Sequence, residues 1–230
     1  MKTSPAPSAP RRARVLVVDD HPIFREGLAE LIQRQPNLTC CAQAGHAREV
    51  LSAVQQAQPD LLLLDLRLGD GDGLDLLPEL MEHFPKLPVL LLSQGDEQLY
   101  AERALRAGAR GYIMKEEAAA EVLNAIATVL AGKAYVSHAL SVRIVAAFIE
   151  PGAKPKLVGM ASLTNRELHI FGMIGAGQTT KEIAAELRLS MKTVQSHREN
   201  LKRKLQLPGG PALVRHATAW LEHNRGKSLP

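Results

Sequence analysis

The sequence predicts a doubly wound α/β domain with a five-stranded parallel sheet, followed by a small all-α domain. Two patterns in the 230 residues support this fold class. In the first part, short apolar runs of strand length alternate with segments of helical length, which is typical of successive βα units. Beyond residue 160, helical segments follow one another with no strand between them.

Five apolar runs are the predicted strands, and each is followed by a predicted helix or by the next turn. The run LLLLD at 61–65 is the clearest, because four consecutive leucines indicate a strand buried on both faces. Gly108 and Gly111 mark the turn into the last strand. The predicted strands lie at 15–18, 38–44, 61–65, 89–92 and 110–114, and the predicted helices near 22–34, 46–57, 73–83, 96–107 and 118–131.

Helix-capping signals divide the C-terminal part into helices. Thr164 with Glu167 opens one helix through a capping box, Thr179 and Ser190 open the next two, and a fourth follows the Pro-Gly-Gly-Pro turn. Residues 1–13 are rich in Pro, Ser and Ala and cannot bury enough surface to fold. The predicted boundaries are a disordered tail at 1–13, the α/β domain at 14–131, a Pro/Gly-rich linker at 132–160 with room for a short helix at 141–150, and the helical domain at 161–226.

Charge is divided unevenly between the two predicted domains. Residues 14–137 contain 11 lysine and arginine residues against 18 aspartate and glutamate residues, a net charge of −7. Residues 161–230 contain 11 against 5, a net charge of +6. A compact basic segment is typical of nucleic-acid binding, so we expect the C-terminal domain to bind nucleic acid.

Location and redox state follow from what the composition lacks. No apolar run is long enough to span a membrane and no secretory signal pattern is present, so we expect a cytoplasmic protein with no membrane partner. Cys40 and Cys41 lack the second pair or the histidine cluster of a zinc site. We therefore expect buried, reduced thiols.

Polar side chains follow four of the predicted strands, where the strands end. Asp19 and Asp20 follow the first, Asp65 the third, Ser93 the fourth and Lys115 the fifth. The carboxyl ends of parallel strands meet at one edge of a sheet, where such folds place their sites. Neighbouring carboxylates repel one another unless a cation lies among them, and oxygen ligands favour Mg²⁺. With Lys115 and Ser93 binding phosphoryl oxygens, Asp65 is suited to act as a nucleophile toward phosphorus.

These residues resemble the receiver domain of two-component response regulators. The resemblance covers residues 14–131 and rests on Asp-Asp-His-Pro at 19–22, Asp65, Ser93 and Tyr-Ile-Met-Lys at 112–115. It implies a flavodoxin-like fold, phosphorylation by a histidine kinase, and a protein that accepts a phosphoryl group and loses it by autodephosphorylation without being a turnover enzyme. The roles it implies are Asp65 as phosphoacceptor, Lys115 beside it, Ser93 and Tyr112 as switch pair, and Asp19, Asp20, Asp65 and the backbone carbonyl of Arg67 as Mg²⁺ ligands.

The loop after Asp65 departs from that family. Its sequence, Leu-Gly-Asp-Gly-Asp-Gly at 68–73, predicts a flexible and acidic loop, but the glycine and closing glutamate of a calcium loop are absent. Arg67 stands where an aspartate-nucleophile phosphatase would have an acid, and Asp-Asp-His-Pro stands where a nucleotide-binding enzyme would have a glycine-rich loop. Arg67 and Gln94 are both expected to affect the lifetime of the phosphoryl group.

The third C-terminal helix carries a polar face at helical spacing, formed by Lys192, Gln195, Ser196, Glu199 and Arg203. A short turn before such a helix indicates a helix-turn-helix that enters the major groove of DNA. The segments LTNRE, KEIAAEL, TVQSHRENLKRKL and LVRHA between 163 and 220 resemble the LuxR-type helix-turn-helix of the NarL/FixJ class. This resemblance implies a homodimer, formed through the fourth helix when the protein is phosphorylated.

The same resemblance assigns DNA contacts. It implies base contacts for Gln195, Ser196 and Glu199, and phosphate or packing roles for Lys181, Lys192, Thr193, His197, Arg198, Lys202 and Arg203. Glu199 either accepts from cytosine, orients an arginine, or does neither, and His197 either contacts DNA or packs in the helical core. The predicted function is a phosphorylation-controlled DNA-binding regulator, and the alternative is a regulator of the same fold that binds DNA independently of phosphorylation.

Overall fold

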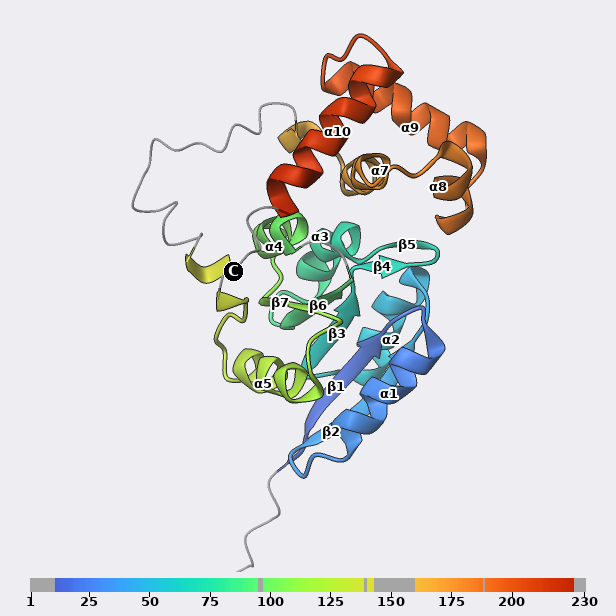
Figure 1. The fold of residues 1–230 in the computed structure, drawn as a ribbon. Helices are drawn as coiled ribbons and strands as arrows, with labels where there is room; N and C mark the ends of the chain where they lie inside the picture. The colour runs from blue at the N-terminus through green and yellow to red at the C-terminus, as the bar shows by residue number, and fades with distance from the viewer. Residues whose placement is uncertain (1–10, 95–96, 139, 143–159, 188, 226–230) are drawn as a thin grey trace, which may run out of the picture. The chain divides into compact units, whose positions relative to one another are not determined.

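The computed structural model describes residues 11–94, 97–138, 140–142, 160–187 and 189–225 (Figure 1). The chain divides into two compact units, one ending at Ser141 and the other beginning at Val142. Within the predicted tail, Arg11 bonds to Asp60 at 3.0 Å and Ala13 already begins a strand. Most of the predicted linker lies outside the described residues, and so does most of the short helix expected at 141–150.

The first unit contains the predicted five-stranded parallel sheet, with strand order β2-β1-β3-β6-β7. The loop after β3 adds a two-stranded antiparallel sheet, which the sequence did not predict. The strands of the main sheet are β1 (Ala13–Val18), β2 (Leu38–Ala44), β3 (Leu61–Asp65), β6 (Val89–Ser93) and β7 (Gly111–Met114), and those of the small sheet are β4 (Arg67–Leu68) and β5 (Gly71–Asp72).

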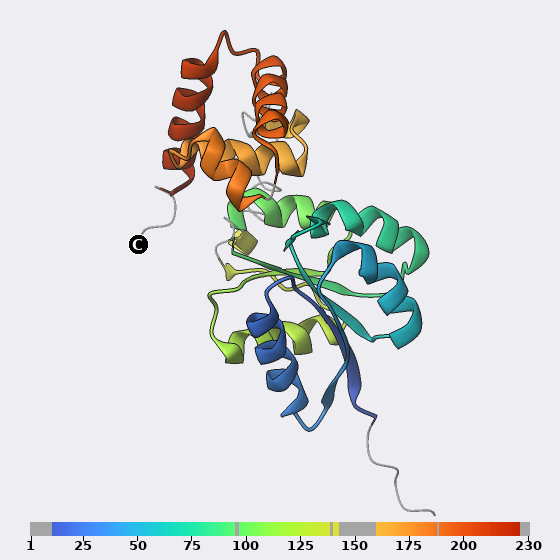
Figure 2. The same cartoon turned by 90° about the vertical axis from the view of Figure 1, so that its right-hand side faces the viewer.

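Helices cover both faces of the main sheet (Figures 1 and 2). Helices α1 and α5 lie on one face, while α2, α3 and α4 lie on the other. Successive side chains of a strand point to opposite faces, so a central strand with helices on both sides must be apolar throughout, as β3 is. The helices are α1 (Pro22–Gln33), the short 3₁₀ helix η1 (Ala47–Glu49), α2 (Val50–Ala57), α3 (Gly73–His83), α4 (Glu97–Arg106) and α5 (Ala119–Leu130).

The two cysteines lie on the edge strand β2 and are only half-buried, so the expectation of buried thiols was wrong. Val15 pairs with Cys40 and Leu16 with Ala42, which leaves Cys41 as an extra residue in the strand. Both thiols are free. Burial raises the pKa of each thiol above its ordinary value, so neither is poised as a reactive thiolate.

The second unit is helical, and its predicted caps are confirmed. Thr164 and Thr179 each form the full capping box, and the Ser190 side chain accepts from the backbone N–H of Thr193. Phe171 and Trp220 pack with ring centroids 5.4 Å apart. The elements are η2 (Met160–Ser162), α7 (Asn165–Gly175), α8 (Thr180–Glu186), α9 (Met191–Lys204) and α10 (Gly210–Arg225). In the described parts of both units, no helix has the length and hydropathy needed to cross a membrane.

Candidate functional site

Strand register brings the predicted carboxylates together. Because β1 pairs in parallel with β3 and Val18 lies opposite Leu64, the next residues, Asp19 and Asp65, lie side by side at the ends of these strands. Asp19 is completely buried and Asp65 is 2% exposed. Two ionisable side chains are thus removed from water in one place, which is costly unless they find a partner charge.

Lys115 supplies that charge. Lys115 directly follows β7, which pairs with β6, and the Lys115 backbone N–H donates to the carbonyl oxygen of Ser93 at 2.7 Å. The Lys115 Nζ lies 2.6 Å from Asp19 Oδ2 and 2.7 Å from Asp65 Oδ2. The ring of Phe24, on α1, lies 4.8 Å from the same ammonium. A single cation therefore bridges two buried carboxylates, and Ser93, itself buried, lies on the neighbouring strand end.

The buried charges shift the protonation of Asp65. The pKa of Asp65 is raised from 3.8 to about 6, mainly because the carboxylate is buried, and the neighbouring Asp19 carboxylate acts in the same direction. The Lys115 ammonium and the backbone N–H of Arg67 act in the opposite direction. Two buried carboxylates face this single ammonium, so the site lacks one positive charge.

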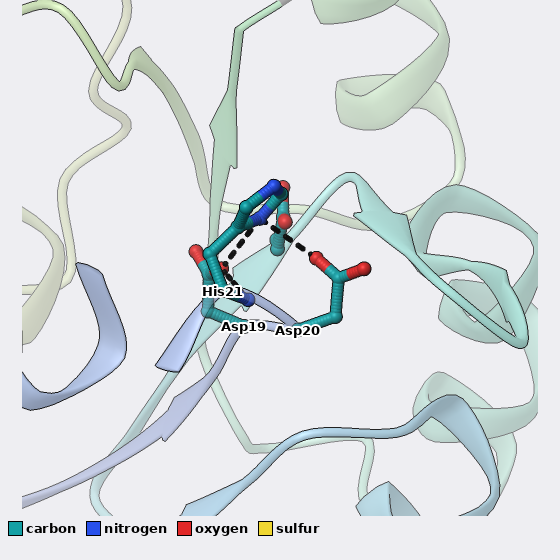
Figure 3. A group of neighbouring side chains, drawn as sticks. Asp19, Asp20 and His21 are labelled. Carbon is teal, nitrogen blue, oxygen red and sulfur yellow. Dashed lines mark hydrogen bonds and ion pairs between the residues drawn. The ribbon is translucent and has the colours of Figure 1, made fainter. Parts of the chain in front are cut away.

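Asp20 and His21 lie beside Asp19 (Figure 3), with Asp20 half-buried and His21 exposed. The His21 Nδ1 lies 2.9 Å from Asp20 Oδ1 and 3.3 Å from Asp19 Oδ1, and the His21 backbone N–H donates to Asp19 Oδ1 at 2.9 Å. Ligand atoms of Asp19, Asp20, His21 and Asp65 all lie within 4.8 Å of one another. Three carboxylates at this spacing, one of them only half-buried, fit a hard divalent cation. The sequence contained His21 in its motif, but we did not predict its contact with both carboxylates.

The loop after Asp65 is held by its own acidic residues. The Arg67 backbone N–H donates to Asp65 Oδ1 at 3.2 Å. The Asp72 side chain caps α3 by accepting from a backbone N–H at 2.9 Å, and Asp70 accepts from a backbone N–H of η1 at 2.7 Å. These carboxylates stabilise neighbouring turns, which gives the acidic residues of the loop a structural role.

Gly73 allows this loop to pass close to the site. A Cβ atom at position 73 would clash with the carbonyl oxygen of Asp65. We expect Gly73→Ala to lower the free energy of unfolding by about 2 kcal/mol, because the backbone of Asp65 would have to move. Urea unfolding measures the change, and Gly27→Ala, where a Cβ would meet no atom within 4 Å, is the matched control. Equal stability of the two variants would contradict the prediction.

The segment after α5 returns to the edge of the sheet beside Tyr112. The Tyr112 backbone N–H donates to the carbonyl oxygen of Tyr135 at 2.9 Å, and the Tyr135 hydroxyl donates to Glu121. The Ser137 hydroxyl donates to Glu97, the first residue of α4, at 2.6 Å. Tyr112 itself is fully buried. The start of the predicted linker is therefore bonded both to β7 and to α4.

The polar face of α9 is exposed as predicted, but several of its side chains are already bonded within the helix. The Ser196 hydroxyl donates to the carbonyl oxygen of Lys192 at 3.1 Å. Burial and the nearby Arg166 lower the pKa of His197, which favours a neutral, packed imidazole. Of the predicted DNA-contacting residues, the exposed ones are Lys181, Lys192, Thr193, Gln195, Ser196, Glu199 and Arg203, and the half-buried ones are His197, Arg198 and Lys202.

An ion pair with a buried glutamate fixes the C-terminal end of α9. The Lys204 Nζ lies 2.6 Å from the carboxylate of Glu167, which is 3% exposed, and donates to the carbonyl oxygen of Ser162 at 3.1 Å. In α10, Leu213 and Ala217 are fully buried, whereas Val214 is 39% exposed. Leu213 and Ala217 therefore pack in the core of their own domain, and Val214 lies at its surface.

A sheet with this acidic edge, followed by a helix-turn-helix domain, defines a two-domain transcription regulator. Residues 15–127 match the model of the response regulator receiver domain, and residues 161–217 match that of the luxR family of bacterial regulatory proteins. The chain belongs to the two-component response regulators of the NarL/FixJ class, which join a receiver domain to a LuxR-type DNA-binding domain. The predicted fold class and family are confirmed.

Relatives of this kind cover nearly the whole chain. The transcriptional regulatory protein MctR of Rhizobium johnstonii is 32% identical over 90% of this chain and 93% of its own length. The transcriptional activator protein ExaE of Pseudomonas putida is 37% identical over 87% of this chain and 93% of its own length. A solved LuxR-family response regulator from Aurantimonas is 32% identical, covers 60% of this chain and 99% of its own, and superposes with a TM-score of 0.56.

Proposed function

We propose that phosphorylation of Asp65 by a histidine kinase controls binding of the helix-turn-helix domain to DNA. The observation that carries this proposal is the buried ammonium of Lys115, which bridges Asp19 and Asp65 beside the half-buried carboxylate of Asp20. A structural ion pair alone would not need three carboxylates for one lysine. A phosphoryl group with a divalent cation would balance the charges of this cluster.

Each residue of the site has a separate role in the phosphoryl transfer. An Asp65 oxygen attacks phosphorus as the bond from phosphorus to the donor breaks, and the Lys115 ammonium and Ser93 hydroxyl bind the transferred oxygens. Asp19, Asp20 and the backbone carbonyl of Arg67 would hold Mg²⁺, which supplies positive charge to the phosphoryl oxygens when bound. Hydrolysis of the resulting acyl phosphate by the same site would reset the protein, which is not a turnover enzyme.

The conformational change at the site would be transmitted along β7 and α4 to the start of the linker. When Ser93 and Lys115 turn toward the phosphoryl group, the adjacent strand β7 and Tyr112 respond. Tyr112 is bonded to Tyr135, and α4 is bonded to Ser137, so both movements reach the start of the linker. Freed by this change, the second domain would dimerise on DNA in the cytoplasm.

The direct test compares DNA binding with and without a small phosphodonor such as acetyl phosphate in Mg²⁺. We expect footprints on genomic DNA to require much less protein after phosphorylation. Equal binding in both conditions would favour the alternative, a regulator that binds DNA independently of phosphorylation.

Lys192 tests the role of α9. Its side chain is exposed in the first turn of the helix, where a phosphate contact is expected. Lys192→Ala should weaken binding to all DNA sequences nearly equally and reduce the slope of log affinity against log salt by about one. Fluorescence anisotropy at several salt concentrations measures both quantities, and an unchanged slope would remove Lys192 from the phosphate contacts.

A further inference from the structure

Two side chains near the middle of α9 form a bonded pair on its exposed face. The Gln195 Nε2 donates to Glu199 Oε1 at 3.0 Å. The Lys202 Nζ lies 2.7 Å from the other oxygen, Glu199 Oε2. Gln195 and Glu199 are exposed, so this pair faces outward from the helical domain.

Other polar side chains on the same face are already hydrogen-bonded within α9 or to its N-cap. The Ser196 hydroxyl donates to the helix backbone, the Thr193 hydroxyl is bonded to Ser190 at 2.8 Å, and Arg203 donates to Asn200 at 3.0 Å. Glu199, by contrast, is held from both sides and still has a free lone-pair direction on each oxygen. The hydrogen bond from Lys202 lowers the pKa of Glu199, so the group is an ionised carboxylate. A carboxylate of this kind can only accept hydrogen bonds.

The bases differ in what they offer to such a carboxylate in the major groove. Guanine and thymine present only acceptors there, and adenine presents an acceptor, N7, next to its amino group. Cytosine presents the N4 amino donor with no acceptor beside it. Guanine and thymine therefore repel a fixed carboxylate. Adenine can donate one hydrogen bond to it, but the interaction is weakened by the neighbouring N7 acceptor. Cytosine donates a hydrogen bond without opposing repulsion. The DNA phosphates also repel the carboxylate, and only a hydrogen bond from cytosine offsets this repulsion.

We propose that Glu199, positioned by Gln195 and Lys202, is a specificity-determining residue that selects a cytosine at one position of the operator. This inference rests on the proposed DNA-binding function and deepens it. Gln195 keeps one amide N–H and its carbonyl oxygen for a neighbouring base, while Lys202 holds the carboxylate from the other side. Glu199 contributes little to affinity for random DNA and much to discrimination.

Glu199→Gln separates the effect of residue 199 on affinity for random DNA from its effect on base discrimination. An amide has both a donor and an acceptor and matches the N6 and N7 groups of adenine. We expect the variant to bind random DNA as well as or better than the unmodified protein, and to lose the preference for cytosine at that position by about 5-fold or more, with adenine gaining. Gln195→Ala, which removes one support of the carboxylate, should relax the same position to a smaller extent.

The experiment is selection from a random DNA library by the full-length, phosphodonor-treated proteins. Glu186→Gln is the matched control, because Glu186 on α8 is also exposed and also accepts from a glutamine amide, Gln178, at 2.9 Å. A motif in which only Glu199→Gln and Gln195→Ala lose the cytosine supports the inference. An identical motif for Glu199→Gln and the unmodified protein overturns it. Failure of every protein, the Glu186→Gln control included, to select any DNA would overturn the proposed function as well.

Discussion

Replacing Asp65 with asparagine should abolish incorporation of phosphate from a small phosphodonor in Mg²⁺. Asparagine has nearly the same shape and keeps an oxygen that can accept from the Arg67 backbone N–H. It lacks the carboxylate nucleophile, so no acyl phosphate forms. Labelling should fall by at least about 100-fold, since a side-chain amide is a poor nucleophile toward phosphorus. Incubation with labelled acetyl phosphate followed by electrophoresis under mild conditions measures the stoichiometry.

Asp75→Asn is the matched control for that experiment. Asp75 lies on the surface of α3, near the site in sequence but not among its carboxylates. This variant should be labelled like the unmodified protein. Comparable labelling of Asp65→Asn and Asp75→Asn would remove Asp65 as the acceptor and, with it, the proposed route of the signal.

The arrangement of the fold was predictable because its strong signals are local. Strands β2 and β3 and helix α3 begin and end at the predicted residues. The leucine run of β3 admits only a strand buried on both faces, and Asp72 caps α3 at the end of a glycine-rich turn. Capping boxes placed the starts of α7 and α8 in the same way.

Contacts between residues far apart in sequence were not predictable. The side chain of Arg67, noted in the sequence only as a departure from the family, hydrogen-bonds to the buried hydroxyl of Tyr100 on α4. The bonds of Tyr135 and Ser137 to the sheet edge and to α4 have no sequence signature either. Periodicity reports which face of an element is buried and not which residue of another element lies against it. A single sequence thus gave the residues of the acidic site and not the contacts that link it to α4 and the linker.

The same acidic site predicts how stability depends on pH. In the unfolded chain Asp65 has its ordinary pKa of 3.8, whereas in the folded protein burial raises this pKa to about 6. Between these values the folded state binds more protons than the unfolded state, so the free energy of unfolding decreases as pH rises through this window. Each pKa unit corresponds to about 1.36 kcal/mol, which makes the loss about 3 kcal/mol above pH ~6.

Asparagine at position 65 is neutral at every pH and escapes this loss. In EDTA, Asp65→Asn should match the unmodified protein in stability near pH 4 and exceed it by about 2 to 3 kcal/mol at pH 7.5. The gain arises because Lys115 then neutralises Asp19 alone, at 2.6 Å, in place of two buried carboxylates. Urea unfolding across this pH range measures the difference. A difference that does not change with pH would mean that Asp65 is ionised throughout, and that Lys115 fully compensates both carboxylates. Mg²⁺ should stabilise the unmodified protein more than the variant, because a divalent cation supplies the charge that the acidic site lacks.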